Sequence, residues 1–220
     1  MSLNIKTTKD IEEVADFVAS SINKQLELGK NVLWFATGGS SIKVQSKVAS
    51  KIKEDHKGKL VITLTDERFG APGHSDSNWF QLKELGFDIA GVRMIPFLTG
   101  KSISETTKEL RDIIKEEMDK ADYKIGNFGI GIDGHTAGIL PHTEAVNSSE
   151  LVCAYNTPLF DRVTITPKVI KELDEAIVFA MGENKWPILE KLEKEFPLEE
   201  DPSQILKQVK LLTIFTDKNI

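Results

Sequence analysis

The stretch Asn31–Ile52, NVLWFATGGSSIKVQSKVASKI, carries the signals that decide the fold of this chain. Its first six residues are mostly apolar and predict a short buried strand over Asn31–Ala36. A glycine- and hydroxyl-rich turn, Thr37–Ser41, follows, and apolar residues then recur at the spacing of an amphipathic helix. A second apolar run, Leu60–Leu64, comes after the turn around Gly58. Strand, helix and strand in this order predict a crossover unit with parallel strands.

The same alternation continues along the whole chain. Further strands are predicted at 92–95, 125–130, 151–155, 162–166, 176–180 and 211–215, and helices at 11–26, 79–85, 102–121, from 167 and at 184–194. Residues 65–78 are predicted to form a long loop, because they contain turn-forming residues and show no period. Residues 197–204 are expected to form a surface loop. The fold class is therefore α/β, with a mostly parallel sheet flanked by helices in a single domain over 1–220.

Composition narrows the class of protein. The chain has 220 residues, of which 40% are hydrophobic, and a net charge of −6, which disfavours a nucleic-acid partner. The lone Cys153 lies in an apolar context and is interpreted as a small core residue. The N-terminal residues show no apolar signal core, and no apolar run approaches the length of a membrane span. We therefore expect a cytoplasmic protein with no membrane partner.

In parallel sheets, ligands bind beyond the carboxyl ends of the strands. This rule selects five loops, which are also the loops richest in glycine, charge and hydroxyl groups: 37–41, 65–78, 131–147, 156–162 and 181–185.

Three of these loops have both a functional and an ordinary interpretation. The turn Thr37–Ser41 suits a phosphate, because glycine admits a ligand to the backbone and the helix start offers free N–H groups. It equally fits a tight turn with a serine cap. Asp66–Arg68, taken alone, fits a solvated turn with an internal ion pair. Lys185 stands at a predicted helix start, where the dipole disfavours a cation. An anionic ligand explains it, and so does simple solvation.

The four histidines are expected to have different roles. His135 follows a strand and lies two residues after Asp133, which can orient it, and imidazole exchanges a proton near neutral pH. We interpret His135 as a base; the alternative is a solvated loop residue. A metal site would need His142 as a partner and lacks a convincing third ligand, so His142 is expected to be structural or peripheral. His56 and His74 are expected at the surface.

Taken together, five stretches resemble the 6-phosphogluconolactonase family, within the wider group that includes glucosamine-6-phosphate isomerase/deaminase. They are TGGSS at 37–41, DERFGAPGHSDSN at 66–78, GIGIDGHTAGILP at 129–141, DRVTIT at 161–166 and GENK at 182–185. The resemblance implies a Rossmann-like fold of the glucosamine-6-phosphate isomerase/ribose-5-phosphate isomerase type. It also implies hydrolysis of the sugar-phosphate substrate 6-phosphoglucono-δ-lactone in the oxidative pentose phosphate pathway, with no metal and no organic cofactor.

The resemblance also implies roles for particular residues. His135 would be the catalytic base, with Asp133 and Asp66 as further catalytic residues, and Asp66 and Arg68 would line the sugar side. The residues that would hold the 6-phosphate are Gly38, Gly39, Ser40, Arg162 and Lys185. The chain departs from the family pattern in three places: Ser-Ser-Ile replaces the usual Ser-Thr-Pro at 40–42, His142 replaces Gly, and Asn127 replaces an Asp.

Two rival functions are weighed against the lactonase. An amino-sugar phosphate isomerase shares the phosphate pocket, but that branch carries a Glu five positions after the histidine, where this chain has Leu140. A catalytically silent sugar-phosphate sensor is compatible with the departures from the family pattern. The retention of His135, Asp133 and Asp66 favours the enzyme.

Overall fold

The computed structural model describes residues 3–219, apart from the side chain of His56, so the surface prediction for that residue lies outside the described part. The larger sheet has seven strands in the order β1-β10-β9-β6-β2-β3-β5, and every neighbouring pair is parallel. The strands are β1 (Asn4–Thr7), β2 (Val32–Ala36), β3 (Leu60–Leu64), β5 (Arg93–Met94), β6 (Tyr123–Phe128), β9 (Glu175–Ala180) and β10 (Leu211–Thr216). The prediction of a mostly parallel sheet is confirmed.

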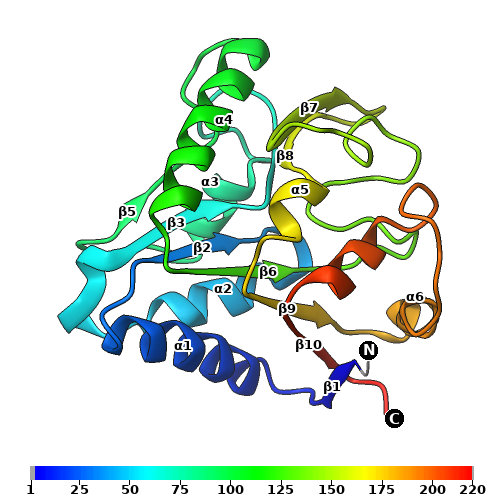
Figure 1. Cartoon of the computed structure of the whole chain (residues 1–220), viewed down its shortest axis with the longest axis horizontal. Coiled ribbons are helices and arrows are strands. Elements are labelled where there is room, and N and C mark those ends of the chain that lie inside the picture. The colour runs from blue at the N-terminus through cyan, green and yellow to red at the C-terminus, as the bar shows by residue number, and fades with distance from the viewer. Residues whose placement is uncertain (1–2, 220) are drawn as a thin grey trace.

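Helices connect and flank these strands (Figure 1). The α-helices are α1 (Ile11–Glu27), α2 (Ile42–Ala49), α3 (Asn78–Glu84), α4 (Ile103–Lys120), α5 (Pro167–Ile170) and α6 (Trp186–Leu192), with 3₁₀ turns η1 (Gly39–Ser41), η2 (Glu54–Lys59), η3 (Glu183–Lys185) and η4 (Pro202–Gln208). Local chemistry sets several helix starts. The side chain of Asp10 accepts a hydrogen bond from the Glu12 N–H, and Ser102 forms a capping box with Glu105.

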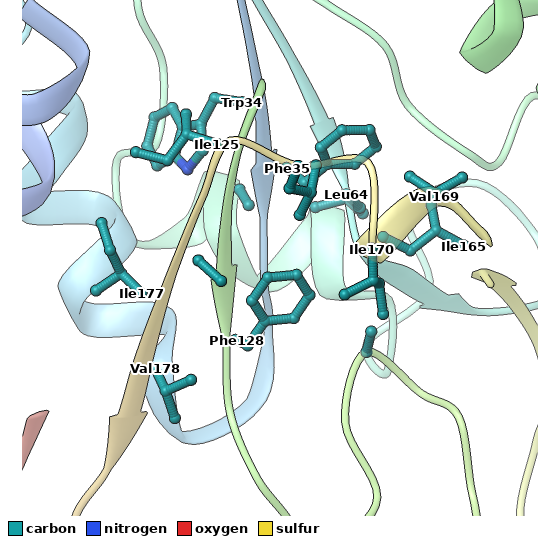
Figure 2. Close-up of a cluster of buried hydrophobic side chains, with 14 of the residues drawn as sticks. Trp34, Phe35, Leu64, Ile125, Phe128, Ile165, Val169, Ile170, Ile177 and Val178 are labelled. Atoms are coloured by element: carbon teal, nitrogen blue, oxygen red, sulfur yellow. The ribbon is translucent and has the colours of Figure 1, made fainter. Parts of the chain in front are cut away.

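The core is centred on β2, all of whose side chains are buried. A strand buried on both faces reads as a continuous apolar run, which is why Val32–Ala36 was recognisable. Figure 2 shows Trp34 and Phe35 of this strand within a cluster of aliphatic side chains from neighbouring strands and α5. Burying each such side chain stabilises the fold by about 1.5–3 kcal/mol. The indole N–H of Trp34 donates to the Asn127 side chain on β6, which satisfies both buried polar groups.

A second, antiparallel sheet was not predicted. It has the order β4-β8-β7, formed by β4 (Asp66–Arg68), β8 (Asp161–Ile165) and β7 (Val152–Asn156). The prediction that 65–78 is wholly loop is therefore wrong at its start. Three charged residues carry no strand pattern, and they become a strand because their backbone pairs with β8. The strands expected at 151–155 and 162–166 exist, but they belong to this antiparallel sheet and not to the parallel one.

Two further segments differ from expectation. The prediction of a surface loop at 197–204 is wrong for its second half, because Asp201–Gln204 are buried against the rest of the chain. The edge strand β1 was missed, since it is short and only partly buried.

Cys153 is buried, as expected for a small core residue. Within residues 3–219, no helix combines the length and the apolar character that crossing a membrane requires.

The parallel arrangement determines where the loops meet. The carboxyl ends of β2, β3, β6 and β9 lie along the same edge of the sheet, so the segments that follow them are brought together. These segments are four of the five loops selected from the sequence.

Candidate active site

A small cleft of about 110 Å³ lies at this edge of the sheet. Every sequence-predicted site residue except Asp133 lines it. The lining residues are Thr37, Gly38, Gly39, Ser40, Asp66, Arg68, Gly129, Ile130, Gly131, His135, Ala137, Gly138, Arg162 and Lys185. Side chains from five separate segments of the chain therefore converge on one space.

His135 and Asp133 form a hydrogen-bonded pair at one side of the cleft. Asp133 Oδ1 lies 2.6 Å from His135 Nδ1 and also accepts from the His135 backbone N–H at 3.2 Å. Because an ionised carboxylate only accepts, Nδ1 of a neutral ring carries the proton and Nε2 is left as the basic nitrogen. The hydrogen bond from His135 lowers the pKa of Asp133 to about 2. The pair passes closely over Gly131, where a Cβ would lie 2.1 Å from Nδ1.

The glycine turn, Thr37–Ser41, forms another wall. Gly39 has a φ of +63°, which glycine adopts readily. A Cβ on Gly38 would lie 2.1 Å from Asn78 Oδ1, so only glycine lets the turn approach α3 this closely. The Asn78 amide in turn donates to the Asp66 carbonyl at 2.9 Å. Ser77 caps α3 by accepting a hydrogen bond from the Phe80 N–H. The bracing role of Asn78 had no sequence signal.

Three cations face the cleft. Arg162 Nη1 lies 3.2 Å from Asp66 Oδ2, and Arg68 Nη1 donates to the Asp76 carbonyl at 2.8 Å. The Nε groups of both arginines are buried without a partner among the described residues. Lys185 donates to the Ile130 carbonyl at 2.7 Å, and burial lowers the pKa of Lys185. Because three cationic side chains line the cleft, it is suited to an anionic ligand.

Glu67 is a supporting residue that the sequence did not reveal. The solvated-turn interpretation of Asp66–Arg68 is wrong, because both Asp66 and Glu67 are buried. The Glu67 carboxylate accepts from the Arg68 N–H at 2.8 Å, and it binds the start of α3 through Ser77 Oγ and the Asn78 and Trp79 N–H groups. Burial raises the pKa of Glu67, while these donors act in the opposite direction. The carboxylate thus folds the loop back so that Arg68 and Asn78 both reach the site.

His142 and His74 lie outside the cleft lining. His142 has a φ of +59°, a left-handed conformation that suits glycine and explains why glycine is usual there in the family that the sequence resembles. Its backbone N–H donates to the Glu199 carbonyl at 3.0 Å, consistent with the structural role expected for it. His74 is half-buried rather than at the surface, with Nε2 3.0 Å from the Arg68 carbonyl. Across residues 3–219, no three His, Cys, Asp or Glu side chains gather as metal ligands.

Fold and cleft together define an α/β protein with a cleft lined by cationic side chains at the carboxyl edge of a parallel sheet. A sequence model of the family described as glucosamine-6-phosphate isomerases/6-phosphogluconolactonase matches residues 6–214. The chain belongs to this family.

Individual relatives agree with this assignment. The 6-phosphogluconolactonase of Helicobacter pylori strain J99 is 28% identical over 218 residues, which cover 95% of this chain and 92% of the relative. The glucosamine-6-phosphate deaminase of Lactobacillus johnsonii is also 28% identical, over 98% of this chain and 95% of its own length. The crystal structure of 6-phosphogluconolactonase from Thermotoga maritima superposes with a TM-score of 0.85 at 21% identity, covering 99% and 100% of the two chains. At this level of identity, the structural similarity shows that the two chains share a fold.

Proposed function

We propose that this chain hydrolyses 6-phospho-D-glucono-1,5-lactone to 6-phospho-D-gluconate, with His135 as the general base. The observation that carries the proposal is the placement of a basic imidazole nitrogen beside a glycine turn and three cations in one cleft. Family membership and the 6-phosphogluconolactonase relatives support the lactone as the substrate. We further propose that the protein acts in the cytoplasm, in the oxidative pentose phosphate pathway.

The phosphate is the natural anchor in this scheme. Gly38, Gly39 and Ser40 offer backbone and hydroxyl donors, while Arg162 and Lys185 supply positive charge in the same cleft. Asp66 holds the Arg162 guanidinium through their ion pair and faces the sugar. Fixing one end of the substrate places the lactone carbonyl near His135 and converts the attack of water into a reaction between oriented partners.

The chemical steps then follow from the His135–Asp133 pair. His135 Nε2 takes a proton from water as the water oxygen bonds to C1, and the carbonyl electrons move to an oxyanion. Arg68 and backbone N–H groups stabilise that charge. When the oxyanion collapses, the bond from C1 to the ring oxygen breaks, and the imidazolium returns its proton to that oxygen. The Asp133 carboxylate stabilises the imidazolium between the two transfers.

The direct test is lactonase activity on freshly generated 6-phosphogluconolactone, corrected for spontaneous hydrolysis. General acid–base catalysis is worth about 10²–10⁴-fold, so His135→Asn is expected to lower kcat by that factor. A His135→Asn variant with full kcat would remove His135 from the mechanism. Tight binding of 6-phosphogluconate by calorimetry, with no turnover by the unmodified protein, would favour the sensor instead.

Because one relative is a glucosamine-6-phosphate deaminase, that activity is a rival function to be tested. That reaction needs a further proton-transfer group, whereas Leu140 supplies no carboxylate, and its N–H contacts the Tyr155 hydroxyl at 3.3 Å. We expect no ammonia release from glucosamine 6-phosphate. Its detection at a rate comparable with lactone hydrolysis would favour the isomerase branch.

A further inference from the structure

A segment near the C-terminus, Glu199–Ser203, which is buried from Asp201 onward, lies against the histidine loop, which we define as Gly131–His142. Two backbone hydrogen bonds join them. The Ser203 N–H donates to the Gly134 carbonyl at 2.9 Å, and the His142 N–H donates to the Glu199 carbonyl at 3.0 Å. The segment therefore contacts both the middle and the end of the loop that carries His135.

Asp201 is the centre of this segment and has no exposed surface. Its Oδ1 accepts from the Ser203 N–H at 3.2 Å and the Ser203 hydroxyl at 2.5 Å, and its Oδ2 accepts from Gln204 Nε2 at 3.0 Å. Within the described part of the chain, no Lys, Arg or His forms an ion pair with it. Burying a carboxylate without a cation is costly, so its presence calls for a role in geometry.

The geometry leads directly to the His135–Asp133 pair. The Gly134 carbonyl and the His135 N–H belong to one planar peptide group, so fixing the direction of the carbonyl fixes that of the N–H. Ser203 holds the carbonyl, and the His135 N–H donates to Asp133 Oδ1. The same carboxylate oxygen holds the imidazole at Nδ1. The orientation of one peptide group thus determines whether the pair can form.

Gly134 allows Asp201 to approach this peptide. It has a φ of +87°, and a Cβ there would lie 2.5 Å from Asp201 Oδ1. We propose that Asp201 is a positioning residue for the His135–Asp133 pair, which it orders by holding Ser203 against the Gly134 carbonyl. The kinetic part of this proposal rests on the proposed lactonase function.

The first test compares Asp201→Ala with a matched control. We expect kcat to fall by about tenfold to 100-fold, because displacement of a reacting group by about 1 Å has effects of this size. KM should stay within about twofold, since the phosphate-binding residues form no hydrogen bond with Asp201. Glu175→Ala is the control. Glu175 is another buried carboxylate bound by hydroxyls, those of Ser21 and Tyr123, at the amino end of β9. It should lower the thermal midpoint and leave kcat unchanged.

Two more variants keep the test decisive if Asp201→Ala does not fold. Ser203→Ala removes one hydrogen bond to the carboxylate and should lower kcat by a smaller factor, with KM unchanged. Asp201→Asn keeps an oxygen that can accept from Ser203, and a turned Gln204 amide can match the new amide group at the loss of one long hydrogen bond, 3.4 Å, to the Lys191 carbonyl. We expect Asp201→Asn to recover most of the activity.

A second readout does not depend on activity. Nitrogen-15 NMR of the imidazole, assigned with His135→Asn, should show the proton of the neutral ring on Nδ1 in the unmodified protein and a mixture of tautomers in Asp201→Ala or Ser203→Ala. If the unmodified protein hydrolyses no lactone, the proposed function fails and the tautomer measurement still decides the role of Asp201. Unchanged kcat and an unchanged tautomer in both variants would overturn the proposal, as would equal kcat losses in Asp201→Ala and Glu175→Ala.

Discussion

At the scale of single residues, the cleft combines charges that are stabilised in different ways. Asp133 is about half exposed, yet its pKa is about 2, because His135 donates to it directly. Asp66 is buried and is balanced by the Arg162 guanidinium. Among the residues that the structure describes, Lys185 has only a backbone carbonyl as its hydrogen-bond partner. These differences lead to separate predictions for Asp133 and Lys185.

Asp133→Asn should lower kcat by about 10²-fold or more with little change in KM. The neutral amide no longer stabilises the imidazolium that forms during the reaction, whereas the phosphate pocket is untouched. Steady-state kinetics on the lactone measure both constants. A variant that raised KM at constant kcat would instead place Asp133 in substrate binding.

The depressed pKa of Asp133 also predicts a pH dependence of stability. The folded-state pKa, about 2, lies below the ordinary value of 3.8, so the carboxylate adds stability that is complete above about pH 4 and is lost as pH falls toward 2. The difference in thermal midpoint between the unmodified protein and Asp133→Asn should be constant at pH 5–6 and shrink below pH 4. A difference that grew on acidification would contradict this linkage.

Lys185→Met should raise KM for the lactone by about 10-fold to 100-fold, the loss expected for a charge-assisted hydrogen bond to the phosphate, with a smaller effect on kcat. Lys171→Met is the matched control, since Lys171 is exposed and lies outside the cleft lining. Kinetics on both variants test the assignment. Equal KM values for the two would show that Lys185 does not bind the substrate.

At the scale of elements, the site depends on close packing between a turn and a helix. The glycine turn follows β2, and α3 follows the loop that begins with β4, so their contact joins two crossover units. Glu67 binds the first turn of α3 and holds this arrangement from beneath. The placement of the turn proposed to bind the phosphate is therefore a property of two elements together.

Gly38→Ala should raise KM and lower the thermal midpoint, because its Cβ would overlap the Asn78 side chain and push the turn away from α3. Gly58→Ala provides the control: a Cβ at that position meets no atom within 4 Å, so the substitution should be neutral or slightly stabilising. Thermal unfolding and lactone kinetics are measured on both. Matching results for the two variants would mean that the contact between the turn and α3 does not matter.

At the scale of the whole molecule, charge is distributed unevenly. The chain carries a net charge of −6, but three cations line the cleft. Many ion pairs, such as Lys115–Asp119, have both partners exposed and contribute little to stability. Raising sodium chloride from 0.05 to 0.5 M should therefore raise KM for the lactone several-fold, through screening, while the thermal midpoint changes little. A KM independent of salt would argue against electrostatic capture of the substrate.

The larger part of the fold and of the candidate site was predictable from local patterns. Short stretches of sequence predicted the buried run at β2, the alternation of strands and helices and the five loops. This is possible because the strand and helix periods repeat over a few residues. The rule that ligands bind at the carboxyl ends of parallel strands then placed the glycine turn, His135 and Lys185 along one edge. All three line the cleft.

The sequence by itself therefore determined the fold class, the parallel sheet and the charged residues that line the cleft. Only the tertiary structure decided which polar residues are buried: Glu67 beneath the loop that follows it, Asp201 against Gly134, and the three-residue strand Asp66–Arg68 within a second sheet. The physical reason is that a buried carboxylate or a short polar strand needs hydrogen-bond partners. Here Glu67 finds its partners at Ser77, Asn78 and Trp79, on the far side of a loop, and β4 pairs with β8, which is distant along the chain. These partners cannot be predicted from neighbouring residues, yet they orient the site residues that the local sequence patterns had identified.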